Sequence, residues 1–202
     1  VALIDLALAE LTEGRPARRA EVAKDDIKAW NMLQLLTSKP VLFVANVDEE
    51  SAATGNEYSK RVEERAEQEG AGCVVISAQI EAELALLDDP DRGEYLETLG
   101  LEEPGLTRLI HAGYDLLDLQ TYFTAGPKES RAWTIRKGWT APKAAGVIHG
   151  DFEKGFIRAE TMNCDDLVRL GSERELKAQN LLRREPRDYV IQEGDVIFVQ
   201  HN

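Results

Sequence analysis

The fold is decided by one stretch of the sequence, Lys39-Pro40-Val41-Leu42-Phe43-Val44-Ala45-Asn46-Val47-Asp48-Glu49. Its apolar part, residues 41–45, is short, continuous and contains two β-branched valines. A run of this kind is typical of a strand that is buried on both faces, as in a parallel sheet. The strand is predicted to end at the polar residues 46–49. Ligands of open α/β sheets bind outside the carboxyl ends of the strands, so this tip is a candidate site.

A second apolar run, Cys73-Val74-Val75-Ile76, ends in the same way at Ser77-Ala78-Gln79. Residues 56–69, between the two runs, have the apolar spacing of a helix, so the order predicts a βαβ unit with a right-handed crossover. The two polar tips then lie at one edge of the sheet. The alternative is that both are ordinary loops, because Asn, Asp and Ser also cap helices.

Further helices are predicted on either side of this unit. Residues 1–13 and 22–36 have helical spacing and are separated by Gly14 and Pro16, which predicts an antiparallel helical hairpin. Residues 80–88 and 104–118 are also expected to be helical. The acidic run Asp88-Asp89-Pro90-Asp91 is interpreted as a solvated loop rather than a cation site.

The sequence changes in character after residue 118, where short β-rich runs replace the helical pattern. A small mixed sheet that grips one helix is the simplest packing for this part. The turn is predicted at Ala125-Gly126-Pro127-Lys128, the strands at 121–124, 132–135, 155–160 and 196–199, and the helices at 142–149 and 167–170.

The charge is divided unequally along the chain, whose formal net charge is −13. Residues 1–115 carry 11 Lys and Arg against 24 Asp and Glu, whereas residues 116–202 carry 13 of each. Because nucleic-acid affinity rests on cationic neutralisation of phosphates, any RNA contact is expected in the second part. The sequence contains no apolar run long enough to span a membrane, and neither a membrane nor DNA is expected as a partner.

The cysteines and histidines do not predict a metal or catalytic centre. Cys73 and Cys164 lack Cys or His neighbours at ligand spacing, so neither a zinc site nor a structural disulfide is expected. No Ser or Cys nucleophile is placed beside His111, His149 or His201, and a catalytic triad is not expected either. His149 is close enough in sequence to Asp151 for polar pairing.

The two polar tips resemble the base-reading loops of P-loop GTPases. Ser77-Ala78-Gln79 is similar to their Ser-Ala-Lys/Gln loop, which contacts the base through backbone N–H groups. Asn46-Val47-Asp48-Glu49 is similar to their Asn-Lys-x-Asp motif, except that Val47 replaces Lys and Glu49 replaces Asp. The altered form, Asn-x-x-Glu, resembles that of the Obg-like ATPases of the YchF type. The resemblance to that family covers nearly the whole chain, at residues 39–49, 120–126, 131–135, 144–149, 151–152 and 155–160.

The resemblance implies an α/β fold in which part of a P-loop NTPase domain, with a Rossmann-like parallel sheet, is followed by a β-grasp (ubiquitin-like) TGS domain. Residues 1–38 are expected to be the end of a helical, coiled-coil arm. Residues 39–115 are expected to be the carboxy-terminal part of the P-loop NTPase domain, and residues 116–202 the TGS domain.

The family's function is implied by the same resemblance. It implies a regulatory, ribosome-associated NTPase of the cytoplasm that binds ATP, with GTP as a second candidate ligand, and hydrolyses ATP to ADP with Mg²⁺. Its ribosomal contact would be with RNA or with a ribosomal protein. Asn46, Val47, Glu49, Ser77, Ala78 and Gln79 are then the candidate base-binding residues.

Phosphoryl transfer depends on a cradle of backbone amides, a Lys and Mg²⁺. Neither Gly-x-x-x-x-Gly-Lys-Ser/Thr nor a strand followed by Asp-x-x-Gly occurs in these 202 residues. In the family these motifs and the Mg²⁺ ligands precede the helical arm, so they are expected upstream of Val1. No catalytic residue is therefore expected in this chain, and the chain alone is not expected to be a competent ATPase.

The replacement of Asp by Glu49 predicts a change in base choice. In the GTPases the Asp carboxylate accepts hydrogen bonds from guanine N1–H and from the exocyclic amine. Moving that carboxylate by one methylene removes a contact worth about 1–3 kcal/mol, enough to erase guanine preference. The hypothesis is adenine or relaxed specificity, with Asn46 near base N7 or the exocyclic amine and Val47 packed on the ring face.

The second part of the chain carries basic residues interleaved with tryptophan, which predicts a stacking and phosphate-binding surface. The alternative is a solvated face with structural Trp residues, because Trp rings more often fill cores. The residues concerned are Arg131, Trp133, Arg136, Lys137, Trp139 and Lys143.

Two other functions remain open at this point. The chain could be a non-enzymatic module that binds ribosomal RNA or protein, and a P-loop upstream of Val1 would argue against that reading. A guanine-specific GTPase is disfavoured by the residues at positions 47 and 49.

Overall fold

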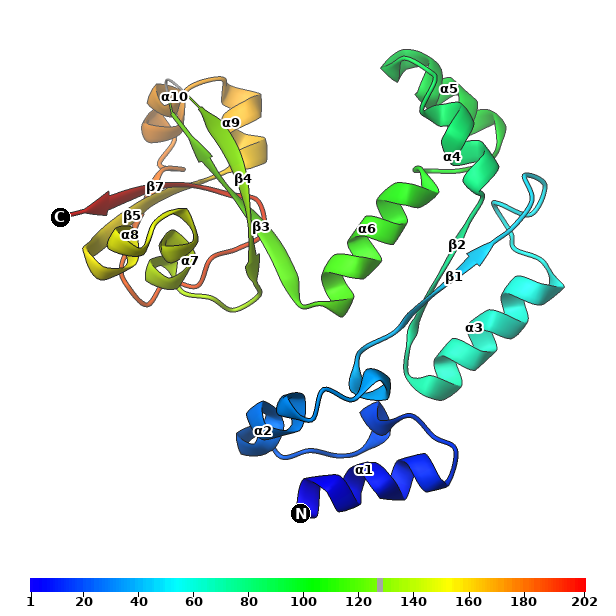
Figure 1. Cartoon of the computed structure of the whole chain (residues 1–202). Helices are drawn as coiled ribbons and strands as arrows, with labels where there is room; N and C mark the ends of the chain where they lie inside the picture. Colours follow the sequence, from blue (N-terminus) through cyan, green and yellow to red (C-terminus); the bar gives the residue numbers. More distant parts are fainter. Residues whose placement is uncertain (127–128) are drawn as a thin grey trace. The chain divides into compact units, whose positions relative to one another are not determined.

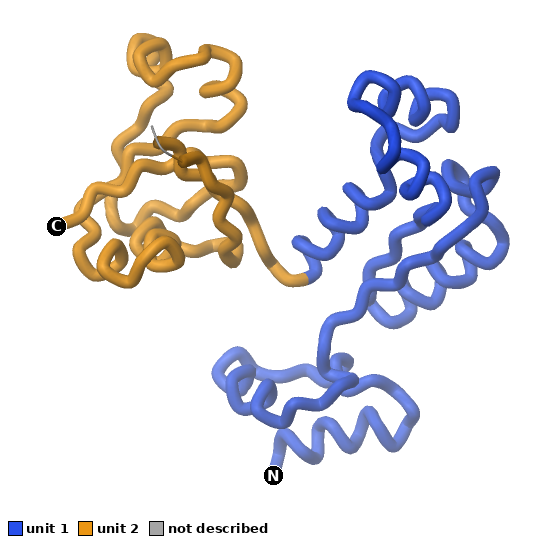
Figure 2. The backbone as a smooth tube through the Cα atoms, turned by 45° about the horizontal axis from the view of Figure 1, so that its top comes forward, with its two compact units in different colours: residues 1–116 blue, residues 117–202 orange. Residues whose placement is uncertain are grey.

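The structure, a computed structural model, describes residues 1–126 and 129–202. The chain forms two compact units, Val1–Leu116 (unit 1) and Leu117–Asn202 (unit 2), which are drawn in different colours in Figure 2. Each unit is described by itself, with the element labels of Figure 1. None of the helices formed by the described residues is long and apolar enough to cross a bilayer.

Unit 1 contains the predicted pair of parallel strands, β1 (Leu42–Asn46) and β2 (Gly72–Ile76). The register runs without a shift from Leu42↔Gly72 to Asn46↔Ile76. Helix α3 (Glu57–Glu69) connects the two strands, as Figure 1 shows, so the predicted βαβ order is confirmed. Both strands consequently end at the same edge of the sheet.

The prediction that the first strand is buried on both faces is wrong. Val44 remains 43% exposed, and Ala45 is the one buried residue of β1. The sheet has only these two strands among the described residues, so the outer edge of β1 has no neighbouring strand. The apolar run therefore indicates how a strand packs in a larger sheet than the one formed here.

Helix α3 is fixed at both ends by its caps. The side-chain oxygen of Asn56 accepts hydrogen bonds from the N–H groups of Tyr58 and Ser59, each at 3.0 Å. Ser59 Oγ accepts from the Asn56 N–H at 2.8 Å, which completes a capping box. This geometry buries Ser59 and leaves Tyr58 72% exposed. Gly70 ends the helix with φ of 64°, a conformation that glycine adopts without strain.

The amino-terminal part of unit 1 departs from the predicted helical hairpin. Helix α1 (Ala2–Thr12) is present as expected, but the second helix is short. The core of this amino-terminal part is a small cluster of Ala7, Ala17 and Trp30. The predicted helix 22–36 is replaced by α2 (Ile27–Met32) and by 3₁₀ turns at Lys24–Asp26 and Leu36–Ser38, with another 3₁₀ turn at Ala17–Arg19.

Three further helices complete unit 1: α4 (Ala78–Leu84), α5 (Asp89–Thr98) and α6 (Gly105–Leu116). Helix α5 begins within the acidic run that was predicted to be a loop, with Asp88 as N-cap and Pro90 in the first turn. Acids and proline suit a helix start, so the run initiates a helix instead of interrupting one.

Unit 2 is a β-grasp fold with the strand order β4-β3-β7-β5-β6. Only the β3–β7 pair is parallel. Its predicted strands are confirmed, whereas β6 is an addition that the pattern did not indicate. The strands are β3 (Leu119–Ala125), β4 (Ser130–Arg136), β5 (Phe156–Asn163), β6 (Arg183–Glu185) and β7 (Asp195–His201).

The helices of unit 2 pack on both faces of this sheet. Helix α7 (Ala141–Ile148) covers one face together with α8 (Gly150–Lys154), and α9 (Cys164–Leu170) and α10 (Glu173–Ala178) cover the other. Neighbouring residues of β7 show the division, because Val196 packs with Leu176 while Ile197 packs in the core beneath α7. Of the predicted turn, Pro127 and Lys128 lie outside the described residues.

Tyr122 holds α7 onto the sheet. Its side chain is fully buried, and its hydroxyl donates a hydrogen bond to the Ala144 carbonyl at 3.0 Å. Burial raises the pKa of Tyr122, so the phenol keeps its proton and remains a donor. The tyrosine thereby satisfies its only polar atom and anchors the helix in the middle of the core.

We expect Tyr122→Phe to loosen α7 without changing the fold. The substitution removes one buried hydrogen bond of a kind worth about 1 kcal/mol. Hydrogen exchange of the α7 amides, followed by mass spectrometry, should show opening that is easier by that amount. Tyr58→Phe, at an exposed tyrosine of α3, should leave the exchange of α7 unchanged. Unchanged α7 exchange in Tyr122→Phe would contradict this role.

Candidate functional site

A side-chain hydrogen bond joins the two polar strand tips. Asn46 ends β1 opposite Ile76, and its Oδ1 accepts a hydrogen bond from the backbone N–H of Ala78 at 2.9 Å. The Val47 N–H donates to the Ile76 carbonyl at 2.9 Å, which extends the ladder by one step. The structure therefore brings the two predicted loops into direct contact.

The Asn46–Ala78 bond also orients the amide of Asn46. Because Oδ1 is occupied by Ala78, the two N–H bonds of Nδ2 remain available as donors. Asn46 is exposed, so a ligand can reach this group. The Ala78 N–H, which was expected to contact a base, is already used by Asn46. A ligand oxygen would have to share or replace that bond.

The residues after Asn46 divide between a turn and a free side chain. Asp48 Oδ1 accepts from the Ser51 N–H at 3.0 Å, so Asp48 caps the turn that follows the strand. The Glu49 carbonyl accepts from the Ala52 N–H at 3.1 Å, while the Glu49 side chain is exposed. Val47 is half-buried. The capping alternative thus holds for Asp48, whereas the carboxylate of Glu49 points into solvent beside the tips.

The second tip contains a buried polar atom that has no partner. Ser77 is 2% exposed, and its Oγ makes no hydrogen bond with any described residue. Although Ser77 is the N-cap residue of α4, its side chain does not cap the helix. Gln79 is exposed and its amide lies 3.5 Å from Glu83 Oε1. A buried hydroxyl without a partner is unfavourable, so a ligand or water is expected to complete its bonding.

Packing behind the tips fixes their position. Ala52 from the first loop packs against Ile80 and Leu84 of α4 and against Leu96 of α5. On the other side, Glu81 Oε1 accepts a hydrogen bond from the Gly105 N–H at 2.7 Å. Because the start of α6 approaches so closely, a Cβ at position 105 would lie 3.0 Å from Glu81 Oε1.

A tyrosine–carboxylate pair joins α5 to α4 next to the first tip. The Tyr95 hydroxyl donates a hydrogen bond to Glu83 Oε2. This bond, together with smaller contributions from burial and from the charges of Glu83 and Glu49, raises the pKa of Tyr95 to about 12.

Two of the basic residues predicted to contact RNA each lie close to a tryptophan ring. The Arg131 guanidinium lies 4.2 Å from the Trp133 ring, and Lys143 Nζ lies 4.3 Å from the Trp139 ring. Both rings are half-buried and pack against the core. Arg136 is five positions beyond Arg131 on the same strand, so the pleat turns the two side chains to opposite faces.

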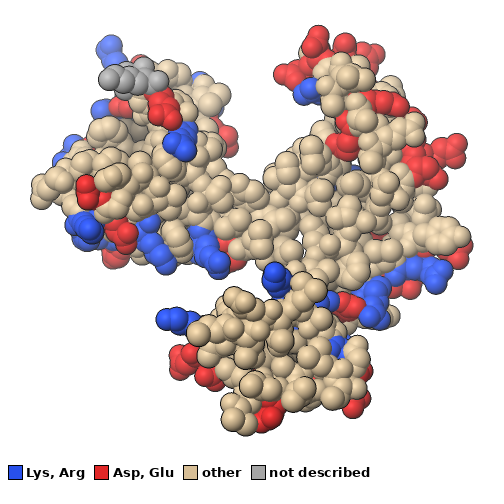
Figure 3. Space-filling view, in the orientation of Figure 1, with Lys and Arg blue, Asp and Glu red and all other residues tan. Residues whose placement is uncertain are grey.

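Figure 3 shows where acidic and basic side chains gather on the surface of each unit. Acidic side chains crowd the end of unit 1 that carries α5, and Lys and Arg line the edge of unit 2 near α7 and α8. Lys137 and Lys143 are exposed, as are Arg131 and Arg136. Each of these four cations can therefore meet a phosphate, and the stacking role of the two tryptophans stays a prediction.

The histidines and acids do not assemble a metal centre in the part of the chain that the structure describes. No group of three or more His, Cys, Asp and Glu side chains lies close enough to hold an ion there. His149 Nδ1 accepts from the Asp151 N–H at 3.2 Å at the start of α8, so the pairing expected from the sequence takes the form of a cap.

Comparison with known proteins places this geometry in a family. The family model YchF-GTPase_C, described as "Protein of unknown function (DUF933)", matches residues 119–202. The chain is 48% identical over 202 residues to "Ribosome-binding ATPase YchF" of Haemophilus ducreyi, which covers 100% of this chain and 55% of that protein. It is 42% identical over 180 residues to "Obg-like ATPase 1" of Rattus norvegicus, covering 88% of this chain and 45% of that protein. The solved structure of the Schizosaccharomyces pombe YchF GTPase matches with a TM-score of 0.83 at 32% identity, over 98% of this chain and 53% of that one.

The parallel βα unit and the β-grasp unit together define part of a P-loop NTPase followed by a TGS domain. The chain belongs to the YchF family of Obg-like ATPases and corresponds to the carboxy-terminal part of its relatives. It spans about half the length of the curated relatives it matches.

We expect Asn46→Ala to uncouple the two tips. The Ala78 N–H would lose its partner, and its exchange with solvent should become about fivefold faster, since a hydrogen bond of this kind contributes about 1 kcal/mol. Amide exchange measured by NMR on the 202-residue chain would test this. Gln79→Ala, which removes a neighbouring exposed amide, should leave Ala78 unaffected; equal protection of Ala78 in all three proteins would refute the coupling.

The Tyr95–Glu83 pair should be visible in a pH titration. The pKa of Tyr95 is raised from its ordinary value of 10 to about 12, so the bond stabilises unit 1 below pH 10 and this contribution is lost as the pH rises through about 12. The tyrosinate absorbance of the chain minus that of Tyr95→Phe should titrate near 12. Glu83→Gln should lower this midpoint toward 10, and Glu94→Gln, elsewhere on α5, should not. A midpoint that ignores Glu83→Gln would disprove the cause.

Proposed function

We propose that this chain is the base-recognising and ribosome-contacting part of a cytoplasmic NTPase that binds ATP, also accepts GTP, and hydrolyses ATP to ADP in the intact protein. The observation that carries the proposal is the bonded pair of strand tips at Asn46 and Ala78, beside the free carboxylate of Glu49. The names of the relatives, ribosome-binding ATPase and Obg-like ATPase, support ATP hydrolysis and the ribosome as partner. The division into arm, P-loop portion and TGS domain is proposed with boundaries at residues 38 and 115.

The residues at the tips fit a purine base. The free Nδ2 donors of Asn46 suit an acceptor such as purine N7, and the buried Ser77 Oγ has a vacant hydrogen-bonding capacity. Val47 is half-buried and offers an apolar surface for the ring, with Ala78 and Gln79 at the neighbouring edge. These residues bind and orient the base; they take no part in bond breaking.

The position of the carboxylate argues for relaxed base choice. A guanine-reading Asp accepts two hydrogen bonds, and Glu49 carries its carboxylate one methylene further from the backbone. The relatives are named both ATPase and GTPase, in line with a site that does not enforce guanine.

The phosphate chemistry belongs to residues that this chain does not contain. When bound, Mg²⁺ would supply the positive charge that neutralises the phosphates during transfer. No set of side chains in the described residues offers it a ligand cluster, and the sequence has no phosphate-binding loop. The residues of this chain are therefore proposed to bind the base and to take no part in hydrolysis.

Ribosome contact is assigned to unit 2. Four of its exposed cations, Arg131, Arg136, Lys137 and Lys143, can neutralise RNA phosphates, whereas unit 1 carries the whole net negative charge. A second candidate function, a purely non-enzymatic RNA- or ribosome-binding module, is favoured by the missing phosphate-binding loop alone. Measurable ATP hydrolysis by the intact protein distinguishes the two.

We expect the intact protein to bind ATP at least as tightly as GTP. Glu49→Asp should shift the ratio of the two dissociation constants toward GTP by a factor of about 5 to 150, because a restored buried contact is worth about 1–3 kcal/mol. Titration calorimetry with both nucleotides measures the ratio.

Glu50→Asp is the matched control for this measurement, because it shortens the neighbouring exposed acid by the same methylene. It should leave the ratio unchanged. A wild-type protein that strongly prefers GTP, or equal effects of the two variants, would remove the basis for the assignment.

A further inference from the structure

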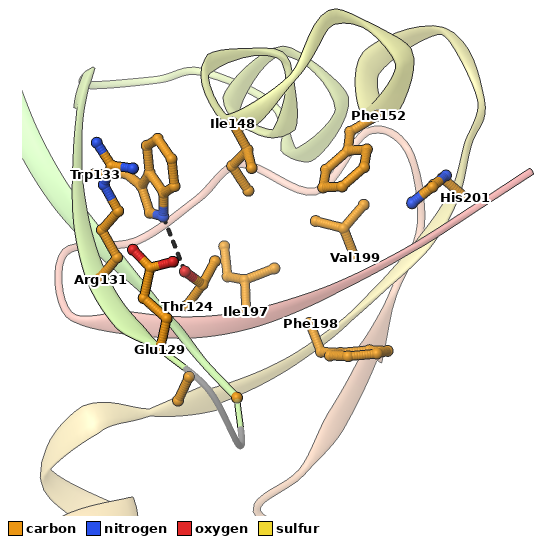
Figure 4. Close-up of a pocket in the computed structure, with 12 residues that line it drawn as sticks. Thr124, Glu129, Arg131, Trp133, Ile148, Phe152, Ile197, Phe198, Val199 and His201 are labelled. Atoms are coloured by element: carbon orange, nitrogen blue, oxygen red, sulfur yellow. Dashed lines mark hydrogen bonds between the residues drawn. The ribbon is translucent and has the colours of Figure 1, made fainter.

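A pocket opens in unit 2 where two parallel strands separate. β3 and β7 share the single register pair Phe123↔Val196. Beyond it, β3 stays paired with β4 as far as Ala125, and β7 with β5 as far as His201. The resulting cavity, on the side of α7 and α8, has a volume of about 360 Å³. It is shown in Figure 4.

Aromatic rings stand at both ends of this pocket. Figure 4 shows Trp133 at one end and Phe152 with His201 at the other, with Ile148 and Ile197 between them. The Trp133 ring is held in place because its Nε1–H donates to Thr124 Oγ1 at 2.9 Å. The Phe152 and His201 rings stack with centroids 4.1 Å apart. The ends are therefore preorganised surfaces for a flat ligand.

The polar groups of the pocket are few and lie near Trp133. The Arg131 guanidinium sits over this ring at 4.2 Å and is exposed, so it can reach a phosphate outside the pocket. Glu129 lines the same end, and its carboxylate can accept a hydrogen bond from an exocyclic amine. A flat apolar ring with an amine at one edge and an anion next to it matches this arrangement.

The size and the charge of the surroundings narrow the ligand further. Pockets for small ligands range from about 300 to 1,000 Å³, so this one has room for a single base with its sugar. The formal charges of unit 2 sum to zero, whereas the net negative charge of unit 1 repels phosphate. A polyanion is consequently tolerated here, and base–aromatic stacking is the usual way in which proteins hold single strands.

We propose that this pocket binds one unstacked, amine-bearing base of single-stranded RNA, with Arg131 at an adjacent phosphate. The inference rests on the RNA contact proposed above and adds which part of the RNA enters the protein. It assigns Phe152, His201 and Glu129 a role that their positions in the sequence did not indicate, because three separate segments bring them together.

The test compares two RNA probes that differ only in one base. A short RNA strand that is abasic except for one central adenine (the single-adenine strand), and the same strand with that residue abasic as well, are titrated into the 202-residue chain by fluorescence anisotropy. Ala125→Trp fills the pocket from an exposed position on its rim, and Ala132→Trp adds the same ring at an exposed position outside it. Both sites lie on the β3–β4 hairpin, so the variants are matched in chemistry and in risk to folding.

We expect the abasic strand to bind about 5- to 150-fold more weakly, the range for loss of one stacked base. Ala125→Trp should weaken binding of the single-adenine strand to the level of the abasic strand, and Ala132→Trp should not. Equal binding of both strands would contradict the proposal that a base enters the pocket. If that binding is still salt-dependent and falls in Arg136→Gln, the RNA contact of unit 2 would stand without base insertion. No RNA binding at all overturns both. Binding of N-acetyltryptophanamide that Ala125→Trp abolishes, without RNA binding, would assign the pocket to a protein partner and also overturn the proposal.

Discussion

The candidate base site depends on one hydrogen bond, from the Ala78 N–H to Asn46 Oδ1. It is possible only because the parallel register places Asn46 opposite Ile76, so that the chain reaches Ala78 two residues later at the same edge. The bond fixes the amide of Asn46 with its donors outward, while the packing of Ala52 on Ile80 and Leu84 holds the first loop over α4. Recognition and fold therefore share the same few contacts: a change that displaces either strand end also disorders the donors that a base would meet.

Much of this arrangement follows from the sequence, because its causes are local. The runs at 41–45 and 73–76 are short and apolar and end in polar residues, which is sufficient to predict two buried-type strands with adjacent tips. The orientation of Asn46 and the isolation of the Ser77 hydroxyl were not predictable, since both depend on how side chains pack after the strands have paired. The alternation of side chains along β4, by contrast, can be read from the sequence, and it turns Arg131 and Arg136 to opposite faces of the sheet.

The errors in the helices have equally specific causes. The apolar spacing of residues 22–36 continues through Gln34, which adopts φ of 52° and ends the helical path without the usual glycine. Helix α5 was missed because it is mostly polar, with Leu96 as its one buried residue. In both cases the periodic pattern of side chains says little about where the backbone turns, and only tertiary packing decides it.

For the 202-residue chain by itself, the unpaired edges of the strand pair in unit 1 affect behaviour in solution. Within the described residues β1 pairs only with β2, so each strand presents a row of amides and carbonyls to the outside, and Val44 adds an apolar face. Such edges are templates for self-association with another copy. The excess of acids in the same unit gives every copy a negative charge, and the electrostatic repulsion between copies opposes association through this edge. High salt would screen this repulsion and favour self-association through the edge.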